Sequence, residues 1–389
     1  MRVAELTVFH ARIALRRPIR HASHTRTDTD NLLVRCVLED GTEGFGEGVP
    51  REYVTGETIH SALDLLRRAE LPAQLPSCRN FSQAVQVGEN LRLPPVPGDE
   101  RCCQGNAARC AVELAILDAY GRHFGEPLSK VTQMLAPELY QIRERVRYSG
   151  AIMSARGLRL RVSALGTRLY GFHQLKVKVG ITGQNDVERL GQIRRLVGPR
   201  MDVRVDANEA WAPEGAVARI QELEPFSITA VEQPVSHKHI DVLATIRKQV
   251  SVPIMHDESL CSRIDAERAV EQGTCDLFNL RLSKCGGFIP TVRLAQFALA
   301  RGLGYQLGCQ VGETAVLSAA GRHFASSVGN IRYLEGSYDR HLVRESLGSK
   351  DFTFGWGGWA PALVGPGLGI HLDAQAITRV TVRKESLLG

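Results

Sequence analysis

The sequence has no apolar run long enough to cross a lipid bilayer, which argues against an integral membrane protein. Its first residues, MRVAELTVFHARIALRR, carry a charge every few positions and contain no continuous apolar core, so we expect no secretory signal. A composition with 43% hydrophobic and 23% charged residues is typical of a soluble globular protein. We therefore expect a cytoplasmic protein without a membrane partner.

Cysteine spacing of the kind that binds zinc is also missing. The nine cysteines include no Cys-x-x-Cys pair and no Cys/His pairing typical of a zinc site. Their number is odd, and several stand in apolar segments, such as Cys110, Cys275 and Cys309. Buried, reduced thiols are the state expected of such residues in the cytoplasm.

The chain also shows no recognisable nucleic-acid-binding module. Its net charge is +6, but the basic residues are scattered. The densest basic stretch, residues 156–168, has no interleaved aromatic residues. We interpret this stretch as a solvated helix face and expect no nucleic-acid partner.

The length of the chain suits two domains, because 389 residues exceed what one small core usually holds. The first part alternates in a β manner, and Asp40-Gly41 between two such runs indicates a hairpin. Residues 105–124 then show apolar residues at helical spacing, and Gly125 ends this helix. Residues 1–130 are thus predicted to form an α+β domain.

Residues 145–350 repeat a different pattern. Short apolar runs recur at intervals of about 25 to 30 residues, the length of one strand, loop, helix and loop. Eight such runs predict an α/β fold in which a parallel barrel is covered by outer helices. An open doubly wound sheet is the alternative, disfavoured because no glycine-rich phosphate fingerprint follows the first strand. Residues 351–389 lose the alternation, and we expect them to return to the first domain.

The run LKVKVG places two lysines, Lys176 and Lys178, in what reads as a buried strand. Side chains alternate along a strand, so both lysines point to the same side. Neighbouring ammonium groups lower each other's pKa, and a lysine held this way can accept a proton near neutral pH. The alternative is a half-exposed strand with two solvated lysines.

Three carboxylates stand at the ends of three consecutive predicted strands: Asp206, Glu232 and Asp257. The C-terminal strand ends of a barrel form its active-site mouth, so these groups would converge there. Converging carboxylates repel one another unless a cation lies among them, and oxygen-only ligation favours Mg²⁺, with Mn²⁺ as an alternative. Glu258 directly follows Asp257 and is an alternative third ligand. The other interpretation is that these acids form salt bridges with nearby lysines.

A further lysine, Lys284, ends the sixth predicted strand and can face Lys178 across the mouth. A metal ion on a substrate carboxylate stabilises the enediolate that forms when the adjacent proton is removed. One lysine would take this proton, and the other would return a proton to the opposite face of the carbon. The pattern predicts a reaction that inverts a stereocentre.

The motifs KVKVG, VDANEAW, VEQP, HDES and SKCGG, in this order and spacing, resemble the enolase superfamily and its muconate-lactonizing subgroup. The phrases GFGEGVP, VTGET and GPGLGI are also similar, so the resemblance covers nearly the whole chain. It implies a modified TIM barrel, (β/α)7β, with an α+β N-terminal capping domain that the end of the chain rejoins. We also expect a homo-oligomer, either a dimer or an octamer.

The resemblance implies a role for each residue of the predicted mouth. The absence of a His-Asp base argues against the mandelate-racemase branch. The implied roles are acid/base catalysis for Lys178 and Lys284, tuning of Lys178 by Lys176, and Mg²⁺ binding by Asp206, Glu232 and Asp257.

In the family, loops of the capping domain close on the substrate, a small carboxylate; here these would be residues 21–27 and 49–58. The subgroup's dipeptide epimerases often carry Asp-x-Asp on the last strand, where this chain has Glu335-Gly336-Ser337. A glycine also precedes Glu313 in the segment GCQVGET. The expected substrate-binding residues are His24, Arg26, Arg51, Tyr53, Gln310 and Glu335.

Three functions are consistent with these patterns. The first is a metal-dependent isomerase that racemises or epimerises an amino-acid derivative or dipeptide. The second is a muconate-type cycloisomerase, for which one lysine would suffice as acid/base. The third is a non-catalytic barrel that binds a partner, which is disfavoured because no lysine and no ligand position is lost.

Overall fold

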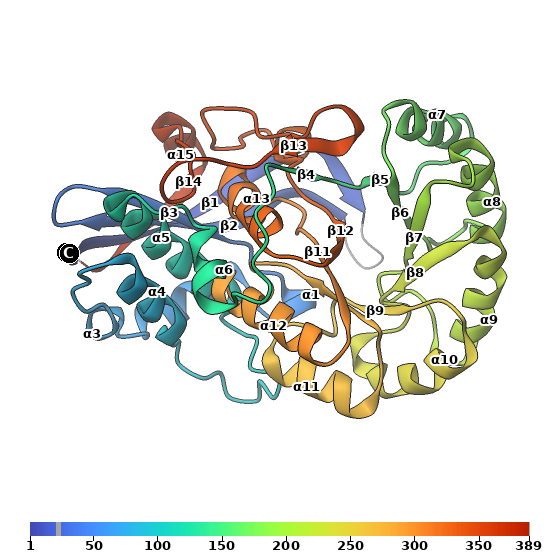
Figure 1. Ribbon diagram of the computed structural model, residues 1–389, viewed down its shortest axis with the longest axis horizontal. Coiled ribbons are helices and arrows are strands. Elements are labelled where there is room, and N and C mark those ends of the chain that lie inside the picture. The colour runs from blue at the N-terminus through green and yellow to red at the C-terminus, as the bar shows by residue number, and fades with distance from the viewer. Residues whose placement is uncertain (21–24, 389) are drawn as a thin grey trace.

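The computed structural model describes residues 1–20 and 25–388. A cap built on an antiparallel sheet lies at one end of the molecule, and a parallel sheet curled within a layer of helices lies at the other (Figure 1). This arrangement confirms the predicted α/β fold, in which a barrel follows an α+β capping domain.

The cap sheet has the strand order β14-β1-β2-β3. Strand β14, from the end of the chain, pairs antiparallel with β1 at one edge of this sheet. Glu43–Gly48 pairs antiparallel with β2 after the turn at Asp40-Gly41, as that dipeptide predicts. The strands are β1 (Val3–Arg20), β2 (Thr25–Leu38), β3 (Glu43–Gly48) and β14 (Thr381–Leu388).

Helix α5 (Asn106–Phe124) is the centre of the cap and is buried along most of its length. It lies against β3 and β2 on one side and contacts helix α12 of the barrel. A helix that is apolar on nearly all faces is expected to be surrounded by protein in this way. The other cap helices are α1 (Glu52–Thr55), α2 (Ile59–Arg67), α3 (Leu71–Gln74), α4 (Phe81–Asn90) and α6 (Lys130–Leu135).

The barrel sheet has eight parallel strands in sequential order from β5 to β12. The Ser149 amide donates a hydrogen bond of 2.8 Å to the Leu334 carbonyl, which brings the two edges of the sheet together. The strands are β5 (Gly150–Ile152), β6 (Gln174–Lys178), β7 (Asp202–Asp206), β8 (Ile228–Glu232), β9 (Ile254–His256), β10 (Leu277–Leu280), β11 (Gly304–Leu307) and β12 (Ile331–Leu334).

A helix follows each of the first seven barrel strands, and Figure 1 shows α7 to α10 as an outer layer on the side away from the cap. Several begin at a side-chain cap: Asn185 accepts from Glu188 N, and Ser262 accepts from Asp265 N. The helices are α7 (Gly157–Leu169), α8 (Asp186–Val197), α9 (Pro213–Leu223), α10 (Leu243–Gln249), α11 (Arg263–Gln272), α12 (Phe288–Ala300) and α13 (Ala315–Ser327).

Shorter elements complete the fold. Strand β4, just before the first barrel strand, pairs with β13 of the C-terminal segment. Among residues 1–20 and 25–388, no helix combines the length and the hydropathy needed to cross a membrane. The remaining elements are β4 (Arg145–Arg147), β13 (Trp359–Pro361), α14 (Asp339–Leu342), α15 (Ala374–Val380) and the 3₁₀ turns Glu224–Phe226, His237–Val242 and Trp356–Gly358.

Candidate active site

The predicted lysines and carboxylates meet at the C-terminal ends of the barrel strands. Strands β6, β7 and β8 end at Lys178, Asp206 and Glu232, and register places Lys178 beside Asp206 and Asp206 beside Glu232. Asp257 directly follows β9, and Lys284 lies in the turn after β10. The three acids are almost completely buried, so their charges need partners within the protein.

Lys176 lies in the middle of these acids. Its ammonium group is 2.8 Å from Asp206, 2.9 Å from Glu232 and 3.0 Å from Glu335. Burial alone lowers the pKa of Lys176, but the three carboxylates outweigh it and raise this pKa well above its ordinary value. The expectation that the paired lysines lower one another's pKa is therefore wrong for Lys176, because acids surround it.

Lys178 and Lys284 occupy opposite parts of the mouth. Lys178 binds Asp206 at 2.7 Å and also contacts the side-chain oxygen of Asn208. Lys284 is fully buried and donates to the Asp257 side chain at 2.9 Å and to the Asp257 carbonyl at 2.6 Å. Strand β10 ends at Leu280, so the prediction that Lys284 ends this strand is wrong, and Lys284 stands in the turn that follows it. Strands β6 and β10 are four positions apart in the eight-stranded order, which is half of the barrel circumference. The two ammonium groups therefore reach the mouth from opposite sides.

The structure adds polar residues that the sequence analysis did not single out. Arg281 contacts Asp257 and lies 3.8 Å from Glu232, and Asn279 donates to Glu232 at 2.8 Å. Arg204 binds Glu335 at 2.6 Å. Strand alternation is the signal that identifies these residues, because Arg204 is two residues from Asp206 on β7 and so points to the same face.

Two family models match most of the chain. Residues 3–132 match the mandelate racemase/muconate lactonizing enzyme N-terminal domain, and residues 159–376 match the enolase C-terminal domain-like family. The chain belongs to the enolase superfamily.

Curated relatives in this superfamily are epimerases and racemases. The chain is 31% identical over 350 residues to the L-Lys-D/L-Arg epimerase of Methylococcus capsulatus, covering 87% of this chain and 91% of that one. It is 30% identical to the hydrophobic dipeptide epimerase of Enterococcus faecalis, over 85% of this chain and 89% of that one.

Solved structures of the superfamily extend this similarity to the fold. The N-succinyl Arg/Lys racemase of Bacillus cereus matches with a TM-score of 0.86 at 26% identity, covering 99% of this chain and all of that one. The Enterococcus faecalis dipeptide epimerase, solved with Mg and the dipeptide L-Leu-L-Tyr, matches with a TM-score of 0.80 at 27% identity, covering 95% and 99% of the two chains.

The acids at the mouth of this superfamily member have the chemistry of a site for a hard divalent cation. Burial, and then the neighbouring Asp206, raise the pKa of Glu232 to about 7, although the Lys176 ammonium lies 2.9 Å away. Burial also raises the pKa of Glu258, and its Oε2 atom is buried without a hydrogen-bond partner. These oxygens suit Mg²⁺ as donors.

The arrangement of the mouth is nevertheless an ion-paired one. Lysine and arginine side chains form ion pairs with Asp206, Glu232 and Asp257. Within the part of the chain that the structure describes, no three His, Cys, Asp or Glu side chains are grouped closely enough to hold a metal ion. The salt-bridge interpretation therefore describes the acids as they lie here. The oxygen donors suit a hard cation in their chemistry, and their role as metal ligands stays a prediction.

The expected substrate-binding residues differ in where they lie. Glu335 lies in the mouth between Lys176 and Arg204, and Gln310 is buried with a side-chain oxygen that has no hydrogen-bond partner. In the cap, the Arg26 guanidinium lies 5.4 Å from the centre of the Tyr53 ring. His24 falls outside the described residues.

Arg51, also expected to bind substrate, is buried in contacts within the chain. Its guanidinium donates to Thr29 Oγ1 at 2.7 Å, to the Val311 carbonyl at 2.6 Å and to the Pro50 carbonyl at 2.8 Å. These contacts connect the cap with the loop that follows β11. Arg51 thereby holds this cap loop over the barrel.

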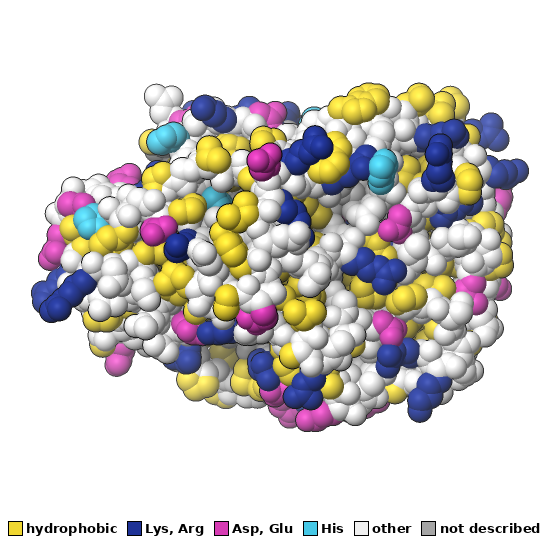
Figure 2. Space-filling view, viewed as in Figure 1, with side chains coloured by type: hydrophobic (Ala, Val, Ile, Leu, Met, Phe, Trp, Pro, Cys, Tyr) yellow, Lys and Arg dark blue, Asp and Glu magenta, His cyan; other side chains and the backbone are white. Residues whose placement is uncertain are grey.

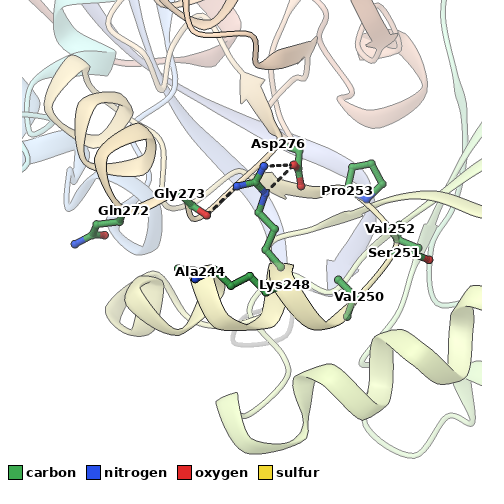
Figure 3. A pocket seen from close by; sticks show the side chains of 10 residues that line it. Ala244, Lys248, Val250, Ser251, Val252, Pro253, Gln272, Gly273 and Asp276 are labelled. Carbon is green, nitrogen blue, oxygen red and sulfur yellow. Dashed lines mark hydrogen bonds and ion pairs between the residues drawn. The ribbon is translucent and has the colours of Figure 1, made fainter.

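Two hollows lie near the barrel. The smaller is lined by Glu313 and Glu335 at the mouth and has a volume of about 10 Å³, room for roughly one water molecule. The larger, of about 450 Å³, lies between α10 and the C-terminal end of α11, where Arg247 binds Asp276 and the Gly273 carbonyl (Figure 3). It adjoins the start of β9 rather than its end, so Asp206, Glu232 and Asp257 are at the other end of the barrel.

Proposed function

We propose that the protein is a Mg²⁺-dependent isomerase that racemises or epimerises the α-carbon of an amino-acid derivative or dipeptide. The observation that carries this proposal is that Lys178 ends β6 and Lys284 lies in the turn after β10, and these two strands are half a barrel apart. A base and an acid on opposite sides of one carbon are what inversion at that carbon requires. The names of the relatives, which are epimerases and racemases, support this function over a muconate-type cycloisomerase.

We assign the cation to Asp206, Glu232 and Asp257, with Glu258 as the alternative to Asp257. A bound Mg²⁺, or Mn²⁺ in its place, would supply positive charge beside the substrate carboxylate and so favour loss of the neighbouring proton. Relatives solved with Mg and a dipeptide support the choice of Mg²⁺.

The lysines carry the proton steps in this proposal. Neutral Lys178 Nζ removes the α-proton from one enantiomer, and protonated Lys284 Nζ delivers a proton to the opposite face. The roles reverse for the other enantiomer. Lys176, held between Asp206 and Glu232 at 2.8 and 2.9 Å, stays charged and stabilises negative charge next to Lys178.

Substrate choice is assigned to residues around the cap and the last strands. Arg26 and Tyr53 present a cationic and aromatic pair from the cap, and Gln310 has a free buried acceptor. Glu335 is already neutralised by Lys176 and Arg204, so we propose that it orients these cations rather than holding a substrate ammonium. His24 and Arg51 remain candidates from the cap loops.

The test is to incubate the protein with Mg²⁺ and a library of dipeptides and N-acyl amino acids in D₂O. We expect α-deuterium to appear by mass spectrometry in the compounds that also change configuration. If no compound of this library exchanges its α-hydrogen, and the protein instead converts an unsaturated diacid offered separately, the protein is a cycloisomerase.

The metal assignment is tested separately by thermal unfolding. Mg²⁺ should raise the melting temperature of the wild type, because a ligand that binds the folded state stabilises it. Asp206→Asn should remove most of this shift while the far-ultraviolet circular dichroism stays native. EDTA should abolish turnover, and full activity in metal-free protein would refute the assignment.

A further inference from the structure

Helix α7 carries a row of large apolar side chains on its solvent face. Leu158, Val162, Leu165 and Leu169 are 75%, 63%, 44% and 62% exposed, although the helix already buries Leu160 and Ala164 against the barrel. The helix packs on β5 and α8 and lies at the edge of the molecule (Figure 1). In Figure 2 hydrophobic side chains gather at this edge beside Lys and Arg side chains. Four exposed apolar residues in one row exceed what scattered surface residues explain.

The spacing of this row is that of a coiled-coil seam. The residues follow one another at intervals of four, three and four, so they alternate between the d and a positions of a heptad. Such a row stays on one face of the helix and matches the surface that a second helix presents. The second, inner face of α7 is used by the barrel, so the outer seam is not needed to hold the helix in place.

The charges that flank the seam all have one sign. Arg159, Arg161 and Arg168 occupy the e and g positions, which decide the choice of partner in a coiled coil. Helix α7 contains no acidic residue. Within the described residues, no ion pair joins these arginines to an acidic side chain. Arg168 donates a hydrogen bond to the Leu196 carbonyl at 3.2 Å, which leaves its charge unneutralised, so all three positive charges can attract an acidic partner.

We infer that the α7 seam, Leu158, Val162, Leu165 and Leu169, docks a helix from another protein that carries apolar residues at a and d and acidic residues at e and g. A second copy of α7 is a poorer match in charge, because its seam is flanked by arginines and the helix has no acidic residue to pair with them. The other described helices of more than one turn expose large apolar side chains only singly, Ile264 on α11 and Leu299 on α12, and so offer no matching seam. The seam also has no aromatic residue of the kind that anchors a helix in a membrane surface.

The experiment uses the full-length protein and two labelled three-heptad peptides with leucine at a and d. One peptide has glutamate at e and g, and the other has lysine there. By fluorescence anisotropy, we expect the glutamate peptide to bind on the order of tenfold or more tightly than the lysine peptide, with affinity falling as NaCl rises.

Variants then separate the apolar seam from its charges. Val162→Asp should abolish binding of the glutamate peptide, whereas Val364→Asp, at a residue 85% exposed in another region, should leave it unchanged. Combined Arg159→Glu, Arg161→Glu and Arg168→Glu should reverse the preference to the lysine peptide. Turnover should be unchanged in all of them, because α7 is outside the catalytic mouth.

Three results would overturn the inference. Equal binding of both peptides would mean that the seam has no charge selectivity. Self-association in sedimentation velocity that Val162→Asp abolishes would identify a second copy as the occupant. Binding to phosphatidylglycerol vesicles without binding to either peptide would identify an anionic surface instead.

Discussion

At the scale of single residues, the mouth of the barrel is a network of buried charges in which each group depends on its neighbours. Burying an unpaired charge is costly, so removing one member exposes the rest of the network to that cost. Substitutions here should therefore keep side-chain volume where they test catalysis. The members are Lys176, Lys178, Lys284, Arg204 and Arg281, opposed by Asp206, Glu232, Asp257, Glu258 and Glu335.

The first prediction separates the proposed acid/base roles of Lys178 and Lys284. Lys178→Met and Lys284→Met should each lose racemisation by on the order of 10²- to 10⁴-fold, because every inversion needs both an acid and a base. Each variant should still exchange the α-proton of one enantiomer in D₂O through the lysine that remains. The exposed Lys238→Met provides a matched control without loss.

Proton nuclear magnetic resonance of each pure enantiomer measures this exchange. Opposite enantiomer preferences in the two variants would support inversion by two lysines. Loss of exchange for both enantiomers in only one variant would show that a single lysine acts as the acid/base.

At the scale of elements, the glycines of β3 decide how closely this strand packs on helix α5 within the cap. Three glycines of β3, Gly44, Gly46 and Gly48, face the backbone of α5, and a Cβ at any of them would overlap the helix backbone at Ala119, Ala111 or Ala107. Strand and helix therefore approach without intervening side chains. The sequence phrase GFGEG allows this contact because glycine has no Cβ.

The second prediction tests this contact with Gly46→Ala. The added methyl group has no free space, so we expect destabilisation of about 3 kcal/mol or more, measured by urea unfolding. Gly166→Ala on α7 is the matched control, because nothing lies within 4 Å of a Cβ there. The control should stabilise the protein by about 0.5 to 1 kcal/mol through its higher helix propensity. Similar effects of the two substitutions would show that β3 can move away from α5.

The elements and their order could largely be predicted from the sequence, because strand periodicity and turn residues are local signals. The strand-end residues Lys178, Asp206 and Glu232 followed from that order. Contacts between distant segments could not be predicted in this way. Arg51 reads as a loop residue, yet its guanidinium reaches the Val311 carbonyl, and nothing near position 51 encodes that partner.

At the scale of the whole molecule, acidic side chains of the capping domain accept hydrogen bonds from the N-termini of barrel helices. Glu47 of β3 accepts hydrogen bonds from the Thr314 and Leu317 amides at the start of α13. Glu113 of α5 does the same for the Phe288 and Ile289 amides at the start of α12. A carboxylate at a helix N-terminus satisfies amides that have no partner in the helix. The two domains are therefore joined through buried polar contacts as well as apolar ones.

Glu47 also links the stability of the domain interface to pH. Burial raises the pKa of Glu47 to about 7, above the 4.5 that is usual for an unfolded glutamate. Between these two values the folded protein holds a proton that the unfolded chain releases. Stability from this group is thus fully present below pH 4.5 and is lost as the pH rises towards 7, by on the order of 3 kcal/mol.

The third prediction is that Glu47→Gln removes this dependence. The amide cannot ionise, and its NH₂ group opposes the α13 amides, so we expect the variant to be less stable at pH 5 by about 1 to 3 kcal/mol. The difference from the wild type should shrink towards pH 7, where Glu47 begins to ionise and the wild type loses this stability. Two other titratable groups lie near Glu47. Burial raises the pKa of Glu313 to about 8 and the pKa of Cys110 well above its ordinary value, so both stay protonated over most of the range from pH 5 to 7. Urea unfolding at both pH values measures the difference, with exposed Glu222→Gln as control. If the free energies of unfolding of wild type and Glu47→Gln differed by the same amount at both pH values, Glu47 would not change its ionisation between them, and the prediction would be wrong.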